Sequence, residues 1–174
     1  MPPSWWTIYS GRELAQGDLL ADCRLPIFWD EPIADSETII DQEICSARLI
    51  ILSQSCDLEN KKLEFVALCP IHTIFEFQAL NPEMAGKGKL EELRKGRREG
   101  LHLLASTENP SDNQSSLIAD FGQIVSLPFA YLVKHAENLG DRHRLNSPYL
   151  EHFSQAFARF FMRVGLPSSI PPFK

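Results

Sequence analysis

The side chains of this chain that are most capable of chemistry follow a short apolar run. Four branched aliphatic residues, Leu49 to Leu52, lead directly into Ser53 and then into Gln54-Ser55-Cys56-Asp57. Hydroxyl, thiol and carboxylate groups at the end of a buried strand are typical of a functional site. They are equally typical of a turn in which Ser and Asp side chains bond the backbone. The sequence leaves both readings open.

A second group of polar residues follows the next apolar run, Phe65 to Cys69. His72 and Thr73 come just after Pro70-Ile71, and Arg48 stands just before Leu49. Cleavage of RNA through its 2′-hydroxyl needs a base, an acid and a cation near the phosphorus. If the ends of the two strands meet, the candidate catalytic residues are Arg48, Ser53, Asp57, His72 and Thr73.

Cys56 is a candidate reactive thiol, with His72 or His102 as its base. The alternative is a Cys that packs as a small apolar residue. Cys56, Cys69 and His72 also suggest half of a zinc site, but no second close pair of ligands completes it. We therefore predict no metal and no cofactor.

The residues from Leu80 to Gly100 are strongly charged and contain the one basic patch of the sequence. A solvated helix face explains such a patch, and a surface that binds nucleic-acid phosphates is the alternative. The candidate nucleic-acid-binding residues are Lys87, Lys89, Arg94, Lys95, Arg97 and Arg98.

Bulk composition limits the possible classes of protein. The chain has 174 residues, a formal net charge of −6 and 44% hydrophobic residues, which fits one globular domain over 1–174. The acidic balance disfavours a generally basic nucleic-acid binder. No apolar run approaches the roughly 18 residues of a membrane span. With no secretory leader at Met1 and four cysteines without a CxxC pair, we expect a cytoplasmic protein that does not engage a membrane.

The order of predicted elements indicates a mostly β fold with some helix. Strands are expected over 19–25, 49–52, 65–69, 101–104 and 118–127, with a charged helical insert over about 78–116. Ser147-Pro148 and the spacing of the phenylalanines predict a C-terminal helix over 147–164, capped by Ser147. Its apolar stripe needs a large surface to cover, which a small β-barrel offers.

In this order the chain resembles the MazF/PemK-like toxin family of small SH3-like barrels. Gly17-Asp18-Leu19 is similar to the opening strand motif of that family, and Leu49-Ile50-Ile51-Leu52-Ser53 to its core strand. Val66-Ala67-Leu68-Cys69-Pro70 resembles the next strand, which ends at a proline. The resemblance implies an SH3-like barrel with a C-terminal helix packed on it. It also implies a bacterial toxin–antitoxin, stress-response or phage-defence setting.

The resemblance further implies an activity, because family toxins cut single-stranded RNA without a metal. They use an arginine just before the core strand and a hydroxyl residue after the second. Here Ala47-Arg48 places the arginine one position later, and Ile71-His72 precede Thr73. We therefore predict a non-catalytic module that binds protein or nucleic acid, with a metal-independent endoribonuclease as the alternative. The predicted partners are an antitoxin-like or defence-complex protein, single-stranded RNA, and a second copy of the chain.

Overall fold

The computed structural model describes residues 3–26 and 44–162, which form eight strands and five α-helices. The strands are β1 (Trp6–Ser10), β2 (Leu19–Pro26), β3 (Ile44–Ile51), β4 (Phe65–Thr73), β5 (Leu101–Leu104), β6 (Leu117–Asp120), β7 (Val125–Pro128) and β8 (Asp141–Leu145). The helices are α1 (Ser55–Glu59), α2 (Ile74–Leu80), α3 (Lys87–Arg94), α4 (Phe129–Leu139) and α5 (Tyr149–Phe161). Two short 3-10 turns are η1 (Pro82–Met84) and η2 (Asn113–Ser115).

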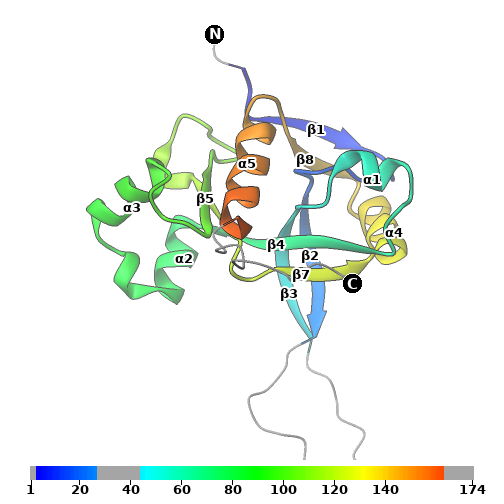
Figure 1. Ribbon diagram of the computed structural model, residues 1–174, viewed down its shortest axis with the longest axis horizontal. Helices are drawn as coiled ribbons and strands as arrows, with labels where there is room; N and C mark the ends of the chain where they lie inside the picture. The colour runs from blue at the N-terminus through cyan, green and yellow to red at the C-terminus, as the bar shows by residue number, and fades with distance from the viewer. Residues whose placement is uncertain (1–2, 27–43, 163–174) are drawn as a thin grey trace, which may run out of the picture.

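All described strand pairs are antiparallel and fall into two sheets. The larger sheet has the order β2-β3-β4-β6-β5, with β7 also paired to β4, and the smaller joins β1 to β8. The long strand β4 runs between two groups of elements (Figure 1). At one end of it lie α2, α3 and β5, and at the other α1 and α4. The prediction of a β-rich fold with helices is confirmed, and the described strands leave the sheet unclosed.

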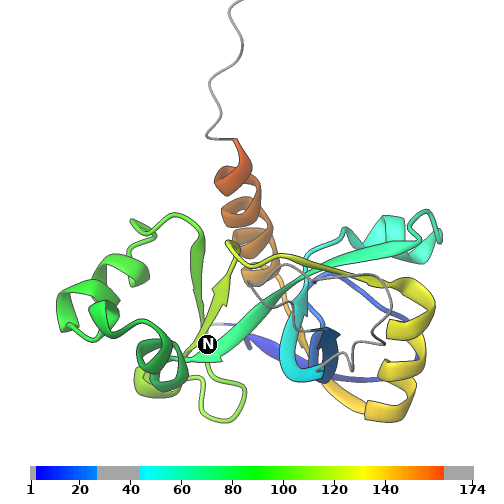
Figure 2. The ribbon, with the colours of Figure 1, turned by 90° about the horizontal axis from the view of Figure 1, so that it is seen from below.

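The predicted core strand is buried on both faces. Ile50 and Leu52 belong to the apolar cluster that Phe153 of α5 covers, whereas Leu49 and Ile51 belong to the cluster that contains Leu132 of α4. Side chains of a strand point alternately to opposite faces, so an unbroken aliphatic run feeds both clusters. Figure 2 shows α5 and α4 as two separate coverings of the sheet. The two predicted apolar strands, β3 and β4, pair as an antiparallel hairpin, with Leu49 opposite Pro70.

Gly17 and Asp18 join the two sheets. The Gly17 N–H donates to the Ile51 carbonyl at 3.0 Å, and its own carbonyl accepts from the Leu145 N–H at 3.1 Å. Gly17 has a φ of +82°, and a Cβ at this position would lie 2.8 Å from Leu145 Cβ. Glycine is therefore required both by the backbone conformation and by the close approach of β8.

The C-terminal helix is present, but its beginning differs from the prediction. Helix α5 spans Tyr149–Phe161, and its N-cap position is Pro148 without a side-chain hydrogen bond, so Ser147 is not the cap. Residues 163 and 164 of the predicted helix lie outside the described part of the chain. Phe153 is fully buried against the sheet, as the apolar stripe predicted.

The insert is less helical than predicted. Within 78–116, α3 covers only Lys87–Arg94, while β5 adds the outermost strand to the larger sheet. Four glycines between residues 86 and 100 are unfavourable within a helix and limit its length. A separate apolar cluster, which includes Phe77, Leu93 and Ile118, anchors this region to the sheet.

No helix among residues 3–26 and 44–162 is long and apolar enough to cross a bilayer.

Candidate functional site

Arg48, in β3, forms an ion pair with α2. Its Nη2 lies 2.7 Å from Oε2 of Glu76, and both side chains are partly exposed. Arg48 lies close to the end of the β3–β4 pair, where Leu49 is opposite Pro70. Arg48 still faces the residues that follow β4.

A capping box holds Glu76 in place. The Thr73 hydroxyl accepts a hydrogen bond from the Glu76 N–H at 3.1 Å, and Oε2 of Glu76 accepts one from the Thr73 N–H at 2.6 Å. Burial raises the pKa of Glu76, but the hydrogen bonds from Thr73 and the charge of Arg48 outweigh it, so the pKa lies below its usual value. Glu76 is therefore a charged carboxylate at neutral pH.

His72 is the third member of the group. Burial lowers its pKa, and the charge of Arg48 adds to this, although Glu76 and Asp120 act in the opposite direction. His72 is thus neutral at neutral pH, with a ring nitrogen able to accept a proton. Nε2 of His72 and Nε of Arg48 are buried with no hydrogen-bond partner among the described residues. Such unsatisfied groups cost about 1–3 kcal/mol each and need an explanation.

These side chains line an open groove of about 460 Å³ between β3, the end of β4 and α2. Apart from Ser46, its other walls are apolar, and two of the apolar residues are unusually exposed: Phe75 by 82% and Leu80 by 66%. An apolar groove with a few convergent polar groups is the usual form of a ligand site. The lining residues are Ser46, Ala47, Arg48, Pro70, Ile71, His72, Phe75, Glu76, Ala79 and Leu80.

Ser53 and Asp57 do not join this groove. The Ser53 hydroxyl accepts from the Ala67 N–H at 2.9 Å, and Asp57 forms an ion pair with Lys62. Ser53 follows Arg48 by five positions, which is roughly 16 Å along an extended strand. The structure therefore brings Arg48, His72 and Thr73 together and places Ser53 and Asp57 at the opposite end of the hairpin.

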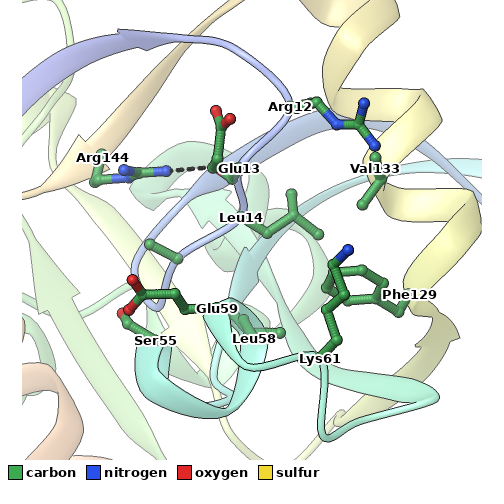
Figure 3. Close-up of a pocket in the computed structure, with 11 residues that line it drawn as sticks. Arg12, Glu13, Leu14, Ser55, Leu58, Glu59, Lys61, Phe129, Val133 and Arg144 are labelled. Carbon is green, nitrogen blue, oxygen red and sulfur yellow. Dashed lines mark hydrogen bonds between the residues drawn. The ribbon is translucent and has the colours of Figure 1, made fainter.

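The residues after Ser53 form α1, which lines a different cavity, of about 600 Å³ (Figure 3). Ser55 and Leu58 line it from α1, and Phe129 lines it from α4. Lys61 lies toward Phe129, whereas Glu59 lies beside Ser55. Cations and carboxylates both line this cavity, so no charged ligand is clearly preferred.

The thiol and zinc alternatives receive no support from the geometry. Cys56 is exposed on α1, whereas Cys69 is buried in the core, where desolvation raises its pKa well above the ordinary value. Among the described residues no group of three or more His, Cys, Asp or Glu side chains is arranged to hold a metal ion.

The basic residues of the insert divide into two groups. Arg94, Lys95 and Arg98 line a cleft against α5, whereas Lys89 and Arg97 do not. The side chain of Lys87 lies outside the described part of the chain. Of the basic patch predicted from the sequence, only Arg94, Lys95 and Arg98 thus line the same cleft.

The sequence reading missed Glu76 and Phe75. Thr73 and Glu76 stand three apart before an apolar segment, which is the signature of a capping box and predicts the start of α2. That signature was available, but the direction of α2, which brings Glu76 to Arg48, depends on packing far along the chain.

Comparisons of the chain with protein-family models, with curated proteins and with solved structures gave no match.

Proposed function

We propose that the chain binds single-stranded RNA in the groove of Arg48, His72 and Glu76 and does not cleave it. The proposal keeps the protein in the bacterial toxin–antitoxin, stress-response or phage-defence setting that the family resemblance implies. The observation that carries it is the exposed Phe75 ring in the same groove as Arg48 and His72, whose Nε and Nε2 atoms have no hydrogen-bond partner within the described part of the chain. An aromatic ring stacks on an unpaired base, and a guanidinium binds a phosphate.

The proposed fold is an open, divergent form of the SH3-like barrel of the MazF/PemK-like proteins. The Gly17–Asp18 corner supports this, because it bonds both β3 and β8 and so connects the two sheets. The groove would then occupy the end of the core strands.

Three of the candidate catalytic groups are already engaged, which favours binding without cleavage. The Thr73 hydroxyl caps α2, Ser53 bonds the Ala67 N–H, and Asp57 pairs with Lys62. Arg48 is itself partly neutralised by Glu76.

One segment of the sequence accounts for the net charge of −6. Residues 27–43 contain six of the 23 acidic residues of the chain and none of its 17 lysines and arginines. The remaining sequence holds 17 acidic and 17 basic residues and so has no net charge, and six of these basic residues lie in the insert.

Binding is tested with a fluorescently labelled single-stranded RNA of mixed sequence and the variants Phe75→Ala and Phe65→Ala. Loss of base stacking costs about 1–3 kcal/mol, so Phe75→Ala should weaken binding about fivefold or more. Phe65 is also exposed but lies in β4 away from the groove lining, and its variant should bind like the wild type. No binding by the wild type, or equal loss in both variants, contradicts the proposal and favours a protein partner.

A second candidate is metal-independent cleavage of the same RNA, and the neutral ring of His72 beside Arg48 favours it. His72 would take the proton of the 2′-hydroxyl, and the 2′-oxygen would attack phosphorus. The bond to the 5′-oxygen would break, giving a 2′,3′-cyclic phosphate, while the leaving oxygen takes a proton from water. Arg48 would stabilise the charge on phosphorus.

Incubation of RNA with saturating protein and a chelator separates the two candidates. We expect intact RNA. Fragments with cyclic phosphate ends that disappear in His72→Gln, while binding persists, would establish the enzyme instead.

A further inference from the structure

A second cleft lies between the insert and the C-terminal helix. It has a volume of about 540 Å³ and is walled by the segment after α3, the first residues of β5 and one face of α5. Figure 1 shows α5 crossing in front of the sheet beside β5. The lining residues are Arg94, Lys95, Gly96, Arg98, Glu99, Gly100, Leu101, His102, Phe121, His152, Gln155, Ala156, Arg159 and Phe160.

Cations outnumber carboxylates along this cleft. Arg94 and Lys95 share a single partner, Glu91, at 2.7 and 3.2 Å. Hydrogen bonds from these two cations lower the pKa of Glu91 to about 2. Arg98 pairs with Glu92 at 3.0 Å, and Glu99 is the one acidic residue among the described residues that line the cleft. On the insert side these three cations are thus balanced by the carboxylates of Glu91, Glu92 and Glu99, and the excess positive charge of the cleft comes from Arg159 on the helix side.

The helix side adds Arg159 and His152. The guanidinium of Arg159 makes one weak contact, 3.5 Å to the Gln155 amide oxygen, and has no carboxylate partner among the described residues. Burial lowers the pKa of His102 to about 4, and the charges of His152 and Arg159 contribute to this. The positive charge of Arg159 thus acts within the cleft.

Aromatic rings line the cleft between these cations. Phe160 packs on Gly100, where a Cβ would lie 3.1 Å from its ring, so the glycine allows α5 to approach β5 closely. His102 lies parallel to Phe121, with ring centroids 6.3 Å apart. Cations on both sides of an aromatic wall are the arrangement that proteins use for single-stranded nucleic acids.

We propose that this cleft binds the phosphodiester backbone of a single-stranded nucleic acid, with Arg94, Arg98 and Arg159 on the phosphates and a base against Phe160. The inference rests on the proposed RNA-binding function for the identity of its ligand. It adds a contact site that recognises phosphate and is built from two parts of the chain, the insert and α5.

The phosphate chemistry is tested without RNA by titrating the protein with inorganic tripolyphosphate in a calorimeter. Arg159→Gln and Arg94→Gln should each weaken binding about fivefold, because each removes a charged hydrogen bond. Arg97→Gln is the matched control, since Arg97 is exposed in the same segment but does not line the cleft. Binding that is absent in the wild type, or equally weakened by Arg97→Gln, overturns the proposal.

A salt titration with a single-stranded oligonucleotide then separates the cleft from the groove. Each phosphate contact contributes about 0.7 to the slope of log K against log salt concentration. The double variant Arg94→Gln/Arg159→Gln should lower that slope by roughly 1.4, and Phe75→Ala should leave it unchanged. If the slope stays the same in the double variant, the cleft proposal fails. If Phe75→Ala binds RNA like the wild type while the double variant lowers the slope, only the groove proposal fails.

Discussion

His102 packs among aromatic rings in β5, and its protonation is coupled to folding. Burial, with the charges of His152 and Arg159, lowers its pKa to about 4 in the folded chain, against about 6.5 when unfolded. The unfolded state therefore binds the proton more readily. The stability that the neutral ring contributes is present above pH 6.5 and is lost as the pH falls toward 4.

The corresponding prediction compares urea unfolding at pH 7 and pH 5. For the wild type, His102 alone should remove about 2 kcal/mol over this interval. In His102→Leu the loss between the two pH values should be smaller by that amount. Equal pH dependence in the two proteins would show that His102 titrates normally in the folded state.

Lys61 has a backbone conformation that usually belongs to glycine. It follows α1 with a φ of +51°, and the Lys62 N–H closes the helix end by donating to the Asp57 carbonyl at 2.9 Å. A side chain in this left-handed conformation is strained, and glycine is the common residue at this position.

We predict that Lys61→Gly raises the free energy of unfolding by about 0.5–1 kcal/mol. Lys61→Ala keeps the strain while removing the charge, so it should change stability by less than about 0.5 kcal/mol. Denaturant unfolding of the three proteins measures this difference. Equal stabilisation by both substitutions would point to charge and not to backbone strain.

Helix α2 is short, and its position depends on its first turn. It has seven residues, and the hydrogen bonds between Thr73 and Glu76 both begin the helix and aim the Glu76 carboxylate at Arg48. We predict that Thr73→Ala lowers stability by about 1 kcal/mol, whereas Thr73→Ser preserves it. Thermal unfolding checks this expectation. A Thr73→Ala protein of unchanged stability would return the hydroxyl to its earlier place among the catalytic candidates.

The helices and strands that could be predicted are those whose sequence patterns are local. The run Leu49–Leu52 and the spacing of phenylalanines such as Phe153 and Phe157 are local patterns, and the strand and helix they predict are present. Ser53 to Asp57 are compatible with a turn, a site or a helix. Only the packing of Leu58 into the core makes that segment α1.

The candidate site was predictable in part for the same reason. Arg48 lies in β3, and His72 and Thr73 lie at the end of β4. Because these two strands are neighbours in the sequence, the proximity of the three residues could be inferred from a hairpin. Glu76 could be recognised as a capping residue but not as the partner of Arg48. Arg159 was even less accessible, because it meets the insert across roughly sixty residues of sequence and no local pattern carries that contact.

Across the whole molecule, Asp18 is the residue that ties the smaller sheet to the larger. Its carboxylate accepts hydrogen bonds from Arg142 at 2.9 Å and from Arg144, and the side chains of Asp18 and Arg142 are fully buried. Arg144 also lies over the Tyr9 ring, 3.7 Å from its centroid. A buried carboxylate between two guanidinium groups satisfies charges that would otherwise be very costly.

We predict that Asp18→Ala lowers the free energy of unfolding by about 3–5 kcal/mol, because it leaves a buried arginine without its counter-charge. Glu64→Ala removes an exposed carboxylate and should change stability by less than about 0.5 kcal/mol. Urea unfolding of both variants provides the measurement. A small loss in Asp18→Ala would mean that water reaches Arg142 once the carboxylate is gone.

The pairing of β1 with β8 has a consequence for synthesis of the chain. Trp6 lies opposite Leu145, so β1 is synthesised long before the strand with which it pairs. Contacts between such distant segments form slowly, and a nascent chain emerges from its N-terminus. Until residue 145 has left the ribosome, β1 therefore lacks its partner strand, and the carboxylate of Asp18 lacks both of its arginine partners. The hairpin of β3 and β4 can form long before that.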